Sequence, residues 1–398
     1  MAGSEAGATS LLYGVPMSGF DVADAVIVGG GAIGCSLAFH LSCQGLSVVL
    51  CERGELGSQS TGRCAGGVRQ QFSSEANVRL QRISVHLLQQ FAEDVGSPCS
   101  FRQIGYLMLL STPAEVASFE QQLRMWHAVG LTEARWVTPD EVAELAPSVS
   151  REGILGGTFC PTDGIASPND VTQGYARGAR RLGATILTET EVMGVDVQGG
   201  RVAAVRTSRG RISTPLVINC AGAWAAELTA SVGVELPVVP YRRHIFVTDA
   251  CPAIPSGSPM TIDVATSFYF HPEGEGVLFG MGEPDEVPSF SVDVDWRVLE
   301  RIQPVLESRV PALLEVGIRT AWAGLYEVTP DHQPFLGPVG DPEGLWLACG
   351  FSGHGFQQAP AVGRILAQMI ADRPVDLDLS PFSPGRDLAM SQPEANFI

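Results

Sequence analysis

Two hydrophobic patterns alternate in the first part of the chain. Residues 24–28, DAVIV, form a short apolar run rich in β-branched side chains, which predicts a strand. Residues 35–45 have the pattern of a helix that ends at Gly45, and residues 46–52 form a second apolar run that ends in Glu52. The order of these runs predicts a β-α-β unit.

Helical periodicity returns further along the chain. Residues 53–72 are rich in glycine and serine and predict a long loop, whereas residues 75–96 predict one amphipathic helix. Residues 112–130 and 138–147 predict two more helices, because each begins with a Thr-Pro pair that is typical of a helix start.

The pattern changes in the second half. Residues 160–197 predict a capped helix and a strand, and residues 214–225 predict an apolar strand that returns to the first sheet. Residues 240–283 alternate between strand-like runs, with a hairpin around Glu273–Gly276. This change indicates a second domain, a mixed sheet inserted into the first fold. A pocket between two such domains is the usual place for a small substrate.

A glycine motif follows the first predicted strand. Gly29, Gly31 and Gly34 have G-x-G-x-x-G spacing: the first permits a tight turn, the second lets a pyrophosphate approach, and the third lets helix and strand pack closely. The helix N-terminus attracts phosphate, and Glu52, 18 residues beyond Gly34, can accept hydrogen bonds from a ribose. This context predicts dinucleotide binding. The sequence has no second such motif, so we expect one dinucleotide that reacts directly with the electron donor.

These patterns predict an α/β fold, with a Rossmann-like cofactor-binding domain and an inserted mixed-sheet substrate domain. The predicted segments are a flexible N-terminal tail at 1–20, a discontinuous cofactor-binding domain at 21–98, 151–232 and 327–379, a substrate-binding domain at 99–150 and 233–326, and a loose C-terminal tail at 380–398.

Composition and charge narrow the class of protein. The chain has 398 residues and a net charge of −18, and all 25 basic residues are arginine, so no lysine can form a Schiff base. An acidic surface without basic clusters argues against nucleic acid or a membrane as partner. No apolar run approaches the roughly 20 residues of a membrane span, and residues 1–20 lack the pattern of a secretory signal.

Nine cysteines are scattered along the chain without a C-x-x-C pair. Their spacing fits neither a disulfide framework nor a zinc site, so no metal is expected. Buried thiols in a reducing compartment explain them, and we expect the protein in the cytoplasm.

Two further segments are candidates for ligand contact. Gly350–Phe356 contains three glycines, two phenylalanines, a serine and a histidine, and a helix-like run with a proline near its start follows. Bare backbone, flat apolar surface and a helix N-terminus thus meet at one point. The predicted loop at 53–72 carries Arg63 and Arg69, which would lie near the middle of the cofactor. A solvated loop with ordinary surface arginines would have the same composition.

Five stretches together resemble a known family: VIVGGGAIG, GSQSTGRCAGGVRQQFSSEANVRL, PTDGIASP, TAWAGLYEVTPDHQPFLGP and GFSGHGFQQAPAVG. They are similar to the FAD-dependent amino-acid and secondary-amine oxidoreductases, that is, the D-amino-acid oxidase superfamily in its sarcosine oxidase and glycine oxidase branch. The β subunits of sarcosine oxidase and of dye-linked L-proline dehydrogenase are particularly similar. The resemblance covers nearly the whole chain and implies a glutathione-reductase-like FAD-binding domain.

The resemblance also implies which residues hold FAD. In such proteins the GFSGHGF segment wraps the isoalloxazine ring, and the following helix directs its N-terminus at the pyrimidine edge. The implied cofactor-binding residues are Gly29, Gly31, Ala32, Ile33, Gly34, Glu52, Arg53, Ser60, Thr61, Arg63, Cys64, Ala65, Gly66, Val192, Cys220, Ala221, Gly222, Trp224, Gly324, Gly350, Phe351, Ser352, Gly353, His354, Gly355, Phe356 and Gln357.

The resemblance assigns the catalytic set to Arg69, Tyr326 and His354. Arg69 matches an arginine that holds the substrate carboxylate, for which a guanidinium is well suited, and the other two match pocket residues. For His354, a structural hydrogen bond within its loop is an equal alternative. Three departures matter: Gly324 replaces the cysteine that attaches FAD, Gln357 replaces a second carboxylate-binding lysine, and the chain lacks the lysine that promotes reaction with oxygen. We therefore expect noncovalent FAD.

The resemblance implies oxidation of a small secondary amino acid or N-methyl amine to an imine, by hydride transfer to flavin N5 (EC class 1.5 or 1.4). The expected partners are this substrate, with oxygen or a protein as electron acceptor, and a possible homo- or hetero-oligomer. The alternatives are an electron-transferring β-type subunit of an amine or proline dehydrogenase, a hydroxy-acid oxidase, and a flavin-binding assembly factor without turnover.

Overall fold

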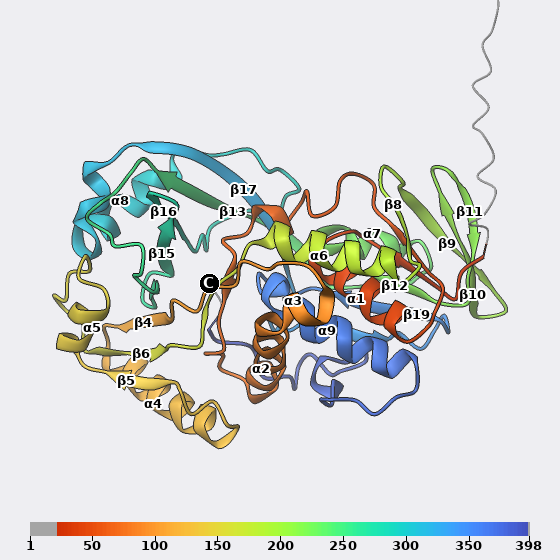
Figure 1. Cartoon of the computed structure of the whole chain (residues 1–398), viewed down its shortest axis with the longest axis horizontal. Helices are drawn as coiled ribbons and strands as arrows, with labels where there is room; N and C mark the ends of the chain where they lie inside the picture. The colour runs from red at the N-terminus through yellow and green to blue at the C-terminus, as the bar shows by residue number, and fades with distance from the viewer. Residues whose placement is uncertain (1–21, 397–398) are drawn as a thin grey trace, which may run out of the picture.

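A computed structural model describes residues 22–396 of the chain, and two large sheets dominate it (Figure 1). The predicted tail at 1–20 lies outside the described residues. Four sheets are present in this range, with six, three, eight and two strands. The two larger ones position the site described below.

The six-stranded sheet is the predicted nucleotide-binding sheet. Its strand order is β18-β19-β12-β1-β2-β8, and all neighbours are parallel except β18 and β19. The strands are β1 (Ala25–Val28), β2 (Val48–Cys51), β8 (Thr185–Leu187), β12 (Val217–Asn219), β18 (Phe335–Pro338) and β19 (Leu345–Cys349). β1, β2 and β12 are buried along their whole length, which explains why each appears as an uninterrupted apolar run. The predicted return of residues 214–225 to this sheet is confirmed by β12, which pairs with β1.

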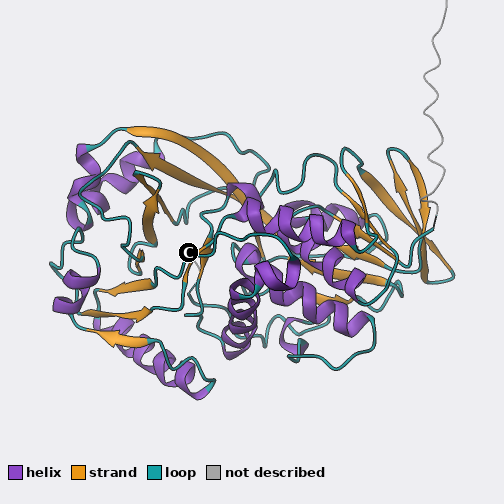
Figure 2. Cartoon of the chain, viewed as in Figure 1, coloured by secondary structure: helices purple, strands orange, loops and turns teal. Residues whose placement is uncertain are grey.

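Helices pack around this sheet (Figure 2). α1 (Ala32–Cys43) contacts both α6 (Pro168–Arg181) and α9 (Gly355–Ile370), and α9 also contacts α2 (Glu75–Gln89). Contact between α1 and α9 is close, because a Cβ on Gly363 would lie 2.3 Å from the Ser36 Oγ atom.

Two predicted helices differ from the structure at their boundaries. The helix predicted at 35–45 begins earlier, at Ala32, because Gly31 is its N-cap. The single helix predicted at 75–96 is divided into α2 and α3 (Phe91–Val95), because the backbone of Gln90 (φ −97°, ψ 6°) leaves the helical region. The apolar period continues across this break, since Phe91 packs edge-on against Tyr175. Periodicity alone could therefore not reveal it.

The eight-stranded sheet is the predicted mixed sheet. Its order is β17-β13-β16-β15-β14-β4-β6-β5, and β14 with β4 is its parallel pair. The strands are β4 (Tyr106–Leu110), β5 (Arg135–Val137), β6 (Gly156–Cys160), β13 (Val239–Thr248), β14 (Met260–Asp263), β15 (Phe268–Glu273), β16 (Gly276–Met281) and β17 (Ile318–Val328). The predicted hairpin is present, with Glu273 paired to Gly276. The long strands β13 and β17 extend from this sheet toward the helices around the six-stranded sheet (Figure 1).

The helices predicted from Thr-Pro pairs begin where expected. Thr112 and Thr138 each form a capping box, which opens α4 (Pro113–Ala128) and α5 (Pro139–Leu145). The other regular elements are β3 (Gly67–Val68), β7 (Gly164–Ile165), β9 (Val192–Gln198), β10 (Arg201–Thr207), β11 (Gly210–Ser213), α7 (Ala225–Ala230), α8 (Val298–Arg309), η1 (Thr61–Arg63), η2 (Gly222–Trp224), η3 (Pro311–Glu315) and η4 (Ser380–Phe382).

The architecture confirms the predicted α/β class, with a nucleotide-binding sheet and a mixed sheet. The exact domain boundaries stay a prediction. Within residues 22–396, no helix combines the length and apolar character that crossing a membrane requires.

The segment predicted as a loose tail is anchored to the rest of the protein at several of its described residues, although many others in it are exposed. Phe382 is fully buried, Glu394 is 1% exposed, and Arg386 forms a buried ion pair with Asp331. A Pro/Ser-rich composition indicates irregular backbone, but it does not prevent a segment from packing against the rest of the protein.

Candidate functional site

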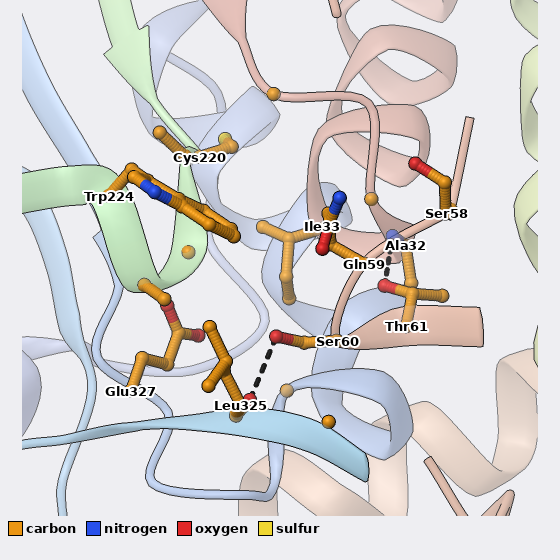
Figure 3. A pocket seen from close by; sticks show the side chains of 18 of the residues that line it. Ala32, Ile33, Ser58, Gln59, Ser60, Thr61, Cys220, Trp224, Leu325 and Glu327 are labelled. Atoms are coloured by element: carbon orange, nitrogen blue, oxygen red, sulfur yellow. Dashed lines mark hydrogen bonds between the residues drawn. The ribbon is translucent and has the colours of Figure 1, made fainter. Parts of the chain in front are cut away.

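A cavity of about 390 Å³ lies where the carboxyl ends of β1, β2 and β12 meet the long strands β13 and β17. Figure 3 shows its labelled residues, which come from α1, from the loop after β2, from the turn after β12 and from β17. Ligands of open parallel sheets bind at this edge. The predicted residues that line it are Gly29, Gly31, Ala32, Ile33, Glu52, Arg53, Ser60, Thr61, Arg63, Cys64, Ala65, Val192, Cys220, Ala221, Gly222, Trp224, Gly324, Tyr326, Gly353, Gly355 and Phe356.

The glycine motif gives the cavity its first wall. Gly29 has a φ of +110°, and a Cβ there would lie 2.3 Å from the Cys220 carbonyl oxygen. A Cβ on Gly34 would lie 2.0 Å from the Gly29 carbonyl oxygen, so this residue packs behind the wall, between helix and strand. Gly31 is the N-cap of α1 and lines the cavity. A phosphate placed there would face a helix N-terminus, as the motif requires.

Glu52 and side chains from the predicted loop at 53–72 hold this wall in place. Glu52 accepts hydrogen bonds from the Gly30 N–H (2.7 Å, at Oε2) and from the Gly54 N–H (2.8 Å, at Oε1). Thr61 accepts one from the Ala32 N–H at 3.1 Å, and Ser60 donates one to the Leu325 carbonyl oxygen at 2.8 Å (Figure 3). The last bond ties the loop to β17. The segment at 53–72 is therefore fixed by contacts to α1 on one side and to β17 of the mixed sheet on the other.

An unpredicted acid lies in the opposite wall. Glu327 of β17 accepts a hydrogen bond at Oε1 from the Phe351 N–H (3.3 Å), whereas its buried Oε2 atom has no partner among residues 22–396. Burial raises the pKa of its carboxyl to about 7, although backbone hydrogen bonds oppose the shift. Nothing in the sequence distinguishes Glu327 from a surface acid on a strand. An unpartnered polar atom of this kind suits a cavity that receives a polar ligand.

The GFSGHGF segment reaches the cavity in part. Gly353 (φ +93°) lies directly against Tyr326, because a Cβ there would be 2.3 Å from a ring carbon. Gly355 and Phe356, at the start of α9, also line the cavity. The N-terminus of α9 therefore lies at the wall of the cavity, and its predicted direction toward the flavin stays a prediction.

Arg69 and His354 lie together behind the cavity wall. Arg69 Nη2 is 3.3 Å from His354 Nε2, and Nη1 donates a 2.9 Å hydrogen bond to the Gln71 carbonyl oxygen. Nη2 also donates to the carbonyl oxygen of Asn396, and the guanidinium lies 4.2 Å from the centre of the Phe72 ring. Burial lowers the pKa of Arg69, whereas burial and the neighbouring Arg69 charge hold the pKa of His354 well below its usual value. The structure thus brings these two predicted residues together. Arg69 is bonded to other residues of the chain, however, and neither residue lines the cavity.

The residues that line the cavity differ in part from the predicted cofactor-binding and catalytic residues. The predicted residues outside the lining are Gly34, Gly66, Arg69, Gly350, Phe351, Ser352, His354 and Gln357. The unpredicted residues of the lining include Arg243, Ile245, Tyr269, Leu325 and Glu327, all of them on strands of the mixed sheet. Alternation along β13 offered a signal for Arg243 and Ile245, but the sequence could not show which face was covered.

The fold and this cavity define the class of protein. It is an oxidoreductase whose dinucleotide site lies between a nucleotide-binding sheet and a mixed sheet. The chain belongs to the DAO family of FAD-dependent oxidoreductases, whose pattern it matches over residues 24–369. FAD is the cofactor of this family. The cavity fits that assignment, because its glycine wall excludes side chains where a dinucleotide must approach the backbone.

Three relatives show how far the similarity extends. The chain is 31% identical to human mitochondrial dimethylglycine dehydrogenase over 92% of its own length, but it spans only 44% of that relative. It is 30% identical to FAD-dependent oxidoreductase domain-containing protein 1 of Xenopus laevis, over 91% of this chain and 82% of the relative. The crystal structure of L-proline dehydrogenase from P. horikoshii superimposes with a TM-score of 0.86 at 32% identity, covering 92% of this chain and 97% of that one.

Proposed function

We propose that the chain catalyses FAD-dependent oxidation of a small secondary amino acid or N-methyl amine to an imine. One observation carries the proposal: a single cavity joins the glycine wall of the nucleotide-binding sheet to a wall of tyrosine and arginine side chains on the mixed sheet. The names of two relatives support the substrate class, since dimethylglycine and L-proline are both amines with a carboxylate.

Bound FAD would supply the redox chemistry, as the acceptor of the hydride from the C–H next to the amine, while the nitrogen lone pair forms the C=N bond. The chain supplies position. Tyr326 lies against the cavity, and burial raises the pKa of its hydroxyl, which therefore stays protonated and can donate a hydrogen bond. His354 stays uncharged because its pKa is held low, so it can orient a neighbour without repelling a cation. No general base is needed if the amine binds deprotonated.

The predicted role of Arg69 in holding the carboxylate depends on the segment at 391–396. The Asn396 carbonyl oxygen accepts a hydrogen bond from the same Nη2 atom that faces His354. For Arg69 to bind a substrate, this segment would have to move away. That role stays a prediction.

We also propose that FAD is held without a covalent bond. Gly324 lines the cavity, and a Cβ there would lie 3.0 Å from the Arg63 Cβ atom, so the position has little room for a side chain. Burial raises the pKa of the Cys64 thiol of the lining to about 11, which disfavours the reactive thiolate.

A second candidate function keeps the same fold. The chain could be the β-type subunit of a dehydrogenase that passes electrons to a protein partner, and both the lack of lysine and the similarity to L-proline dehydrogenase favour it. We further propose oxygen as the alternative electron acceptor, assembly into a homo- or hetero-oligomer, and a cytoplasmic location. The scattered thiols support that location.

Anaerobic reduction of the purified flavoprotein tests the proposal. We expect sarcosine, dimethylglycine or L-proline to bleach the flavin absorbance, whereas lactate leaves it unchanged. Bleaching by lactate alone would assign a hydroxy-acid oxidase, and no bleaching by any compound would favour the assembly-factor alternative. An oxygen electrode then decides the acceptor: slow peroxide formation together with rapid reduction of an artificial dye would support the dehydrogenase subunit.

A further inference from the structure

A second arginine, which the resemblance does not single out, reaches the cavity from the mixed sheet. Arg243 lies on β13, directly opposite Gly324 of β17. Residues alternate between the faces of a strand, so Arg243 shares its face with Ile245, and both line the cavity. His244 lies on the other face, where its Nδ1 atom is 2.8 Å from Glu283.

The surroundings of Arg243 suit an anion. Within residues 22–396, no carboxylate oxygen lies within 4.0 Å of it, whereas the neighbouring Arg242 pairs with Glu286 at 3.0 Å. The Nη1 atom of Arg243 donates to the Arg242 carbonyl oxygen at 2.8 Å. Its Nε atom is buried and has no partner among the described residues. A half-buried guanidinium in this state is unusual, because buried cations are normally paired.

Tyrosine side chains surround Arg243, and two of them also line the cavity. The Arg243 guanidinium carbon lies 5.4 Å from the centre of the Tyr326 ring and 6.0 Å from that of Tyr241. Tyr326 and Tyr269 line the same cavity. A ligand carboxylate at Arg243 would therefore lie next to a phenol donor, and its uncharged part would face the cofactor side of the cavity.

The other arginines near the cavity have partners. Arg69 contacts Gln71, His354 and Asn396. Arg63 donates to the Ala323 carbonyl oxygen at 2.9 Å, and the exposed Arg53 lies over the Trp224 ring at 3.8 Å. Of the arginines that line the cavity, Arg243 is thus the one on the mixed sheet, away from the glycine wall.

We propose that Arg243 binds the carboxylate of the substrate and selects carboxylated amines over uncharged ones. A guanidinium can hold a carboxylate with two parallel hydrogen bonds, and the Nε atom of Arg243 has no partner among the described residues that would compete for this contact, although it is buried in this structure. The proposal rests on the function proposed above, but it concerns binding and can be tested without turnover.

The test uses a matched pair of probes that cannot reduce the flavin, 2-furoate and its neutral carboxamide. Their dissociation constants are measured with the FAD-loaded full chain, from the change each causes in the flavin absorbance. We expect the wild type to bind 2-furoate at least about tenfold more tightly than the carboxamide, the value of one charge-assisted hydrogen-bonded pair. In Arg243→Gln this preference should fall to about one, and Arg243→Lys should retain part of it, because lysine keeps the charge but loses the fork.

Two controls assign the effect. Arg242→Gln removes the same charge from the preceding residue of β13, and we expect this variant to keep the preference for 2-furoate. The proposal would be overturned if Arg69→Gln lost the preference for 2-furoate while Arg243→Gln kept it. A wild-type protein without this preference would overturn it as well. If Arg243→Gln does not fold, an unchanged preference in Arg243→Lys overturns it instead. If no amine reduces the flavin although Arg243→Gln abolishes the preference, the proposed function fails and the Arg243 site stands.

Discussion

At the scale of single residues, the cavity region contains two acids whose ionisation opposes folding. Burial raises the pKa of Glu327 from 4.5 to about 7 and that of Asp163 from 3.8 to about 6. The Asp163 carboxylate accepts hydrogen bonds from Gln70 and Gln71. The Glu327 carboxylate accepts a hydrogen bond from the Phe351 N–H at Oε1, whereas its buried Oε2 atom has no partner among residues 22–396. Glu327 is therefore the better position for a test.

Glu327→Gln should change how the stability of the apoprotein depends on pH. In the wild type the folded state keeps the proton between pH 4.5 and about 7 while the unfolded state loses it, so the free energy of unfolding falls as pH rises through this window. The fall should be about 3 kcal/mol, and the variant should lack it. Urea unfolding at pH 5 and pH 8 measures both. Glu227→Gln, at an exposed acid of the same cavity lining, is the control, and parallel curves for Glu327→Gln and wild type would contradict the interpretation.

At the scale of elements, the segment at 391–396 is fastened to the start of α2. The Glu394 carboxylate accepts hydrogen bonds from the N–H groups of Ser73 (2.7 Å) and Ser74 (3.2 Å) and from the side-chain amide of Asn77 (2.9 Å). An acid at a helix N-terminus is favourable, because unpaired N–H groups and the helix dipole meet there. The same segment places Asn396 on Arg69. The Glu394 carboxylate therefore helps to hold the segment that covers Arg69.

Glu394→Ala should release this segment. Several buried donors lose their acceptor, so we expect the free energy of unfolding to fall by about 2–3 kcal/mol and limited proteolysis after residue 386 to accelerate. Urea unfolding and a time course with a nonspecific protease measure the two effects. Glu120→Ala, at an exposed acid of α4, should change neither. A Glu394→Ala protein that resists protease like the wild type would show that other contacts hold the segment.

At the scale of the whole molecule, the cavity couples the two sheets. The glycine wall and Glu52 belong to the nucleotide-binding sheet, whereas Arg243 and Tyr326 belong to the mixed sheet. A ligand that spans the cavity must contact both sheets and stabilise the folded chain by mass action. A longer ligand makes contacts along more of the cavity, so we expect it to stabilise the folded protein more strongly than a shorter ligand does.

FAD should raise the melting temperature of the apoprotein more than FMN does at the same concentration. FMN lacks the adenosine part, which we expect to lie along Glu52 and Val192, so it forgoes the contacts of that end of the cavity. Differential scanning fluorimetry of the apoprotein with FAD and with FMN measures the two shifts. Equal shifts with FAD and FMN would mean that the adenosine end contributes no binding free energy.

The sequence by itself determined the cofactor half of this protein. Strand β1, the three glycines, α1 and Glu52 lie within residues 24–52, so their geometry follows from local rules of turns, helix starts and strand polarity. The resemblance then supplied FAD and most of the lining, because the same short stretches recur in the family.

Only the tertiary structure decided which charged groups face the cavity. Arg243, Glu327 and Tyr269 reach it because strands distant in sequence pair in one register, and a shift of one residue would turn each away. Arg69 lies beside Asn396, although 327 positions separate them. Local pattern fixes the backbone that approaches a dinucleotide, whereas the partners of a buried charge depend on contacts between distant segments, which no local pattern contains.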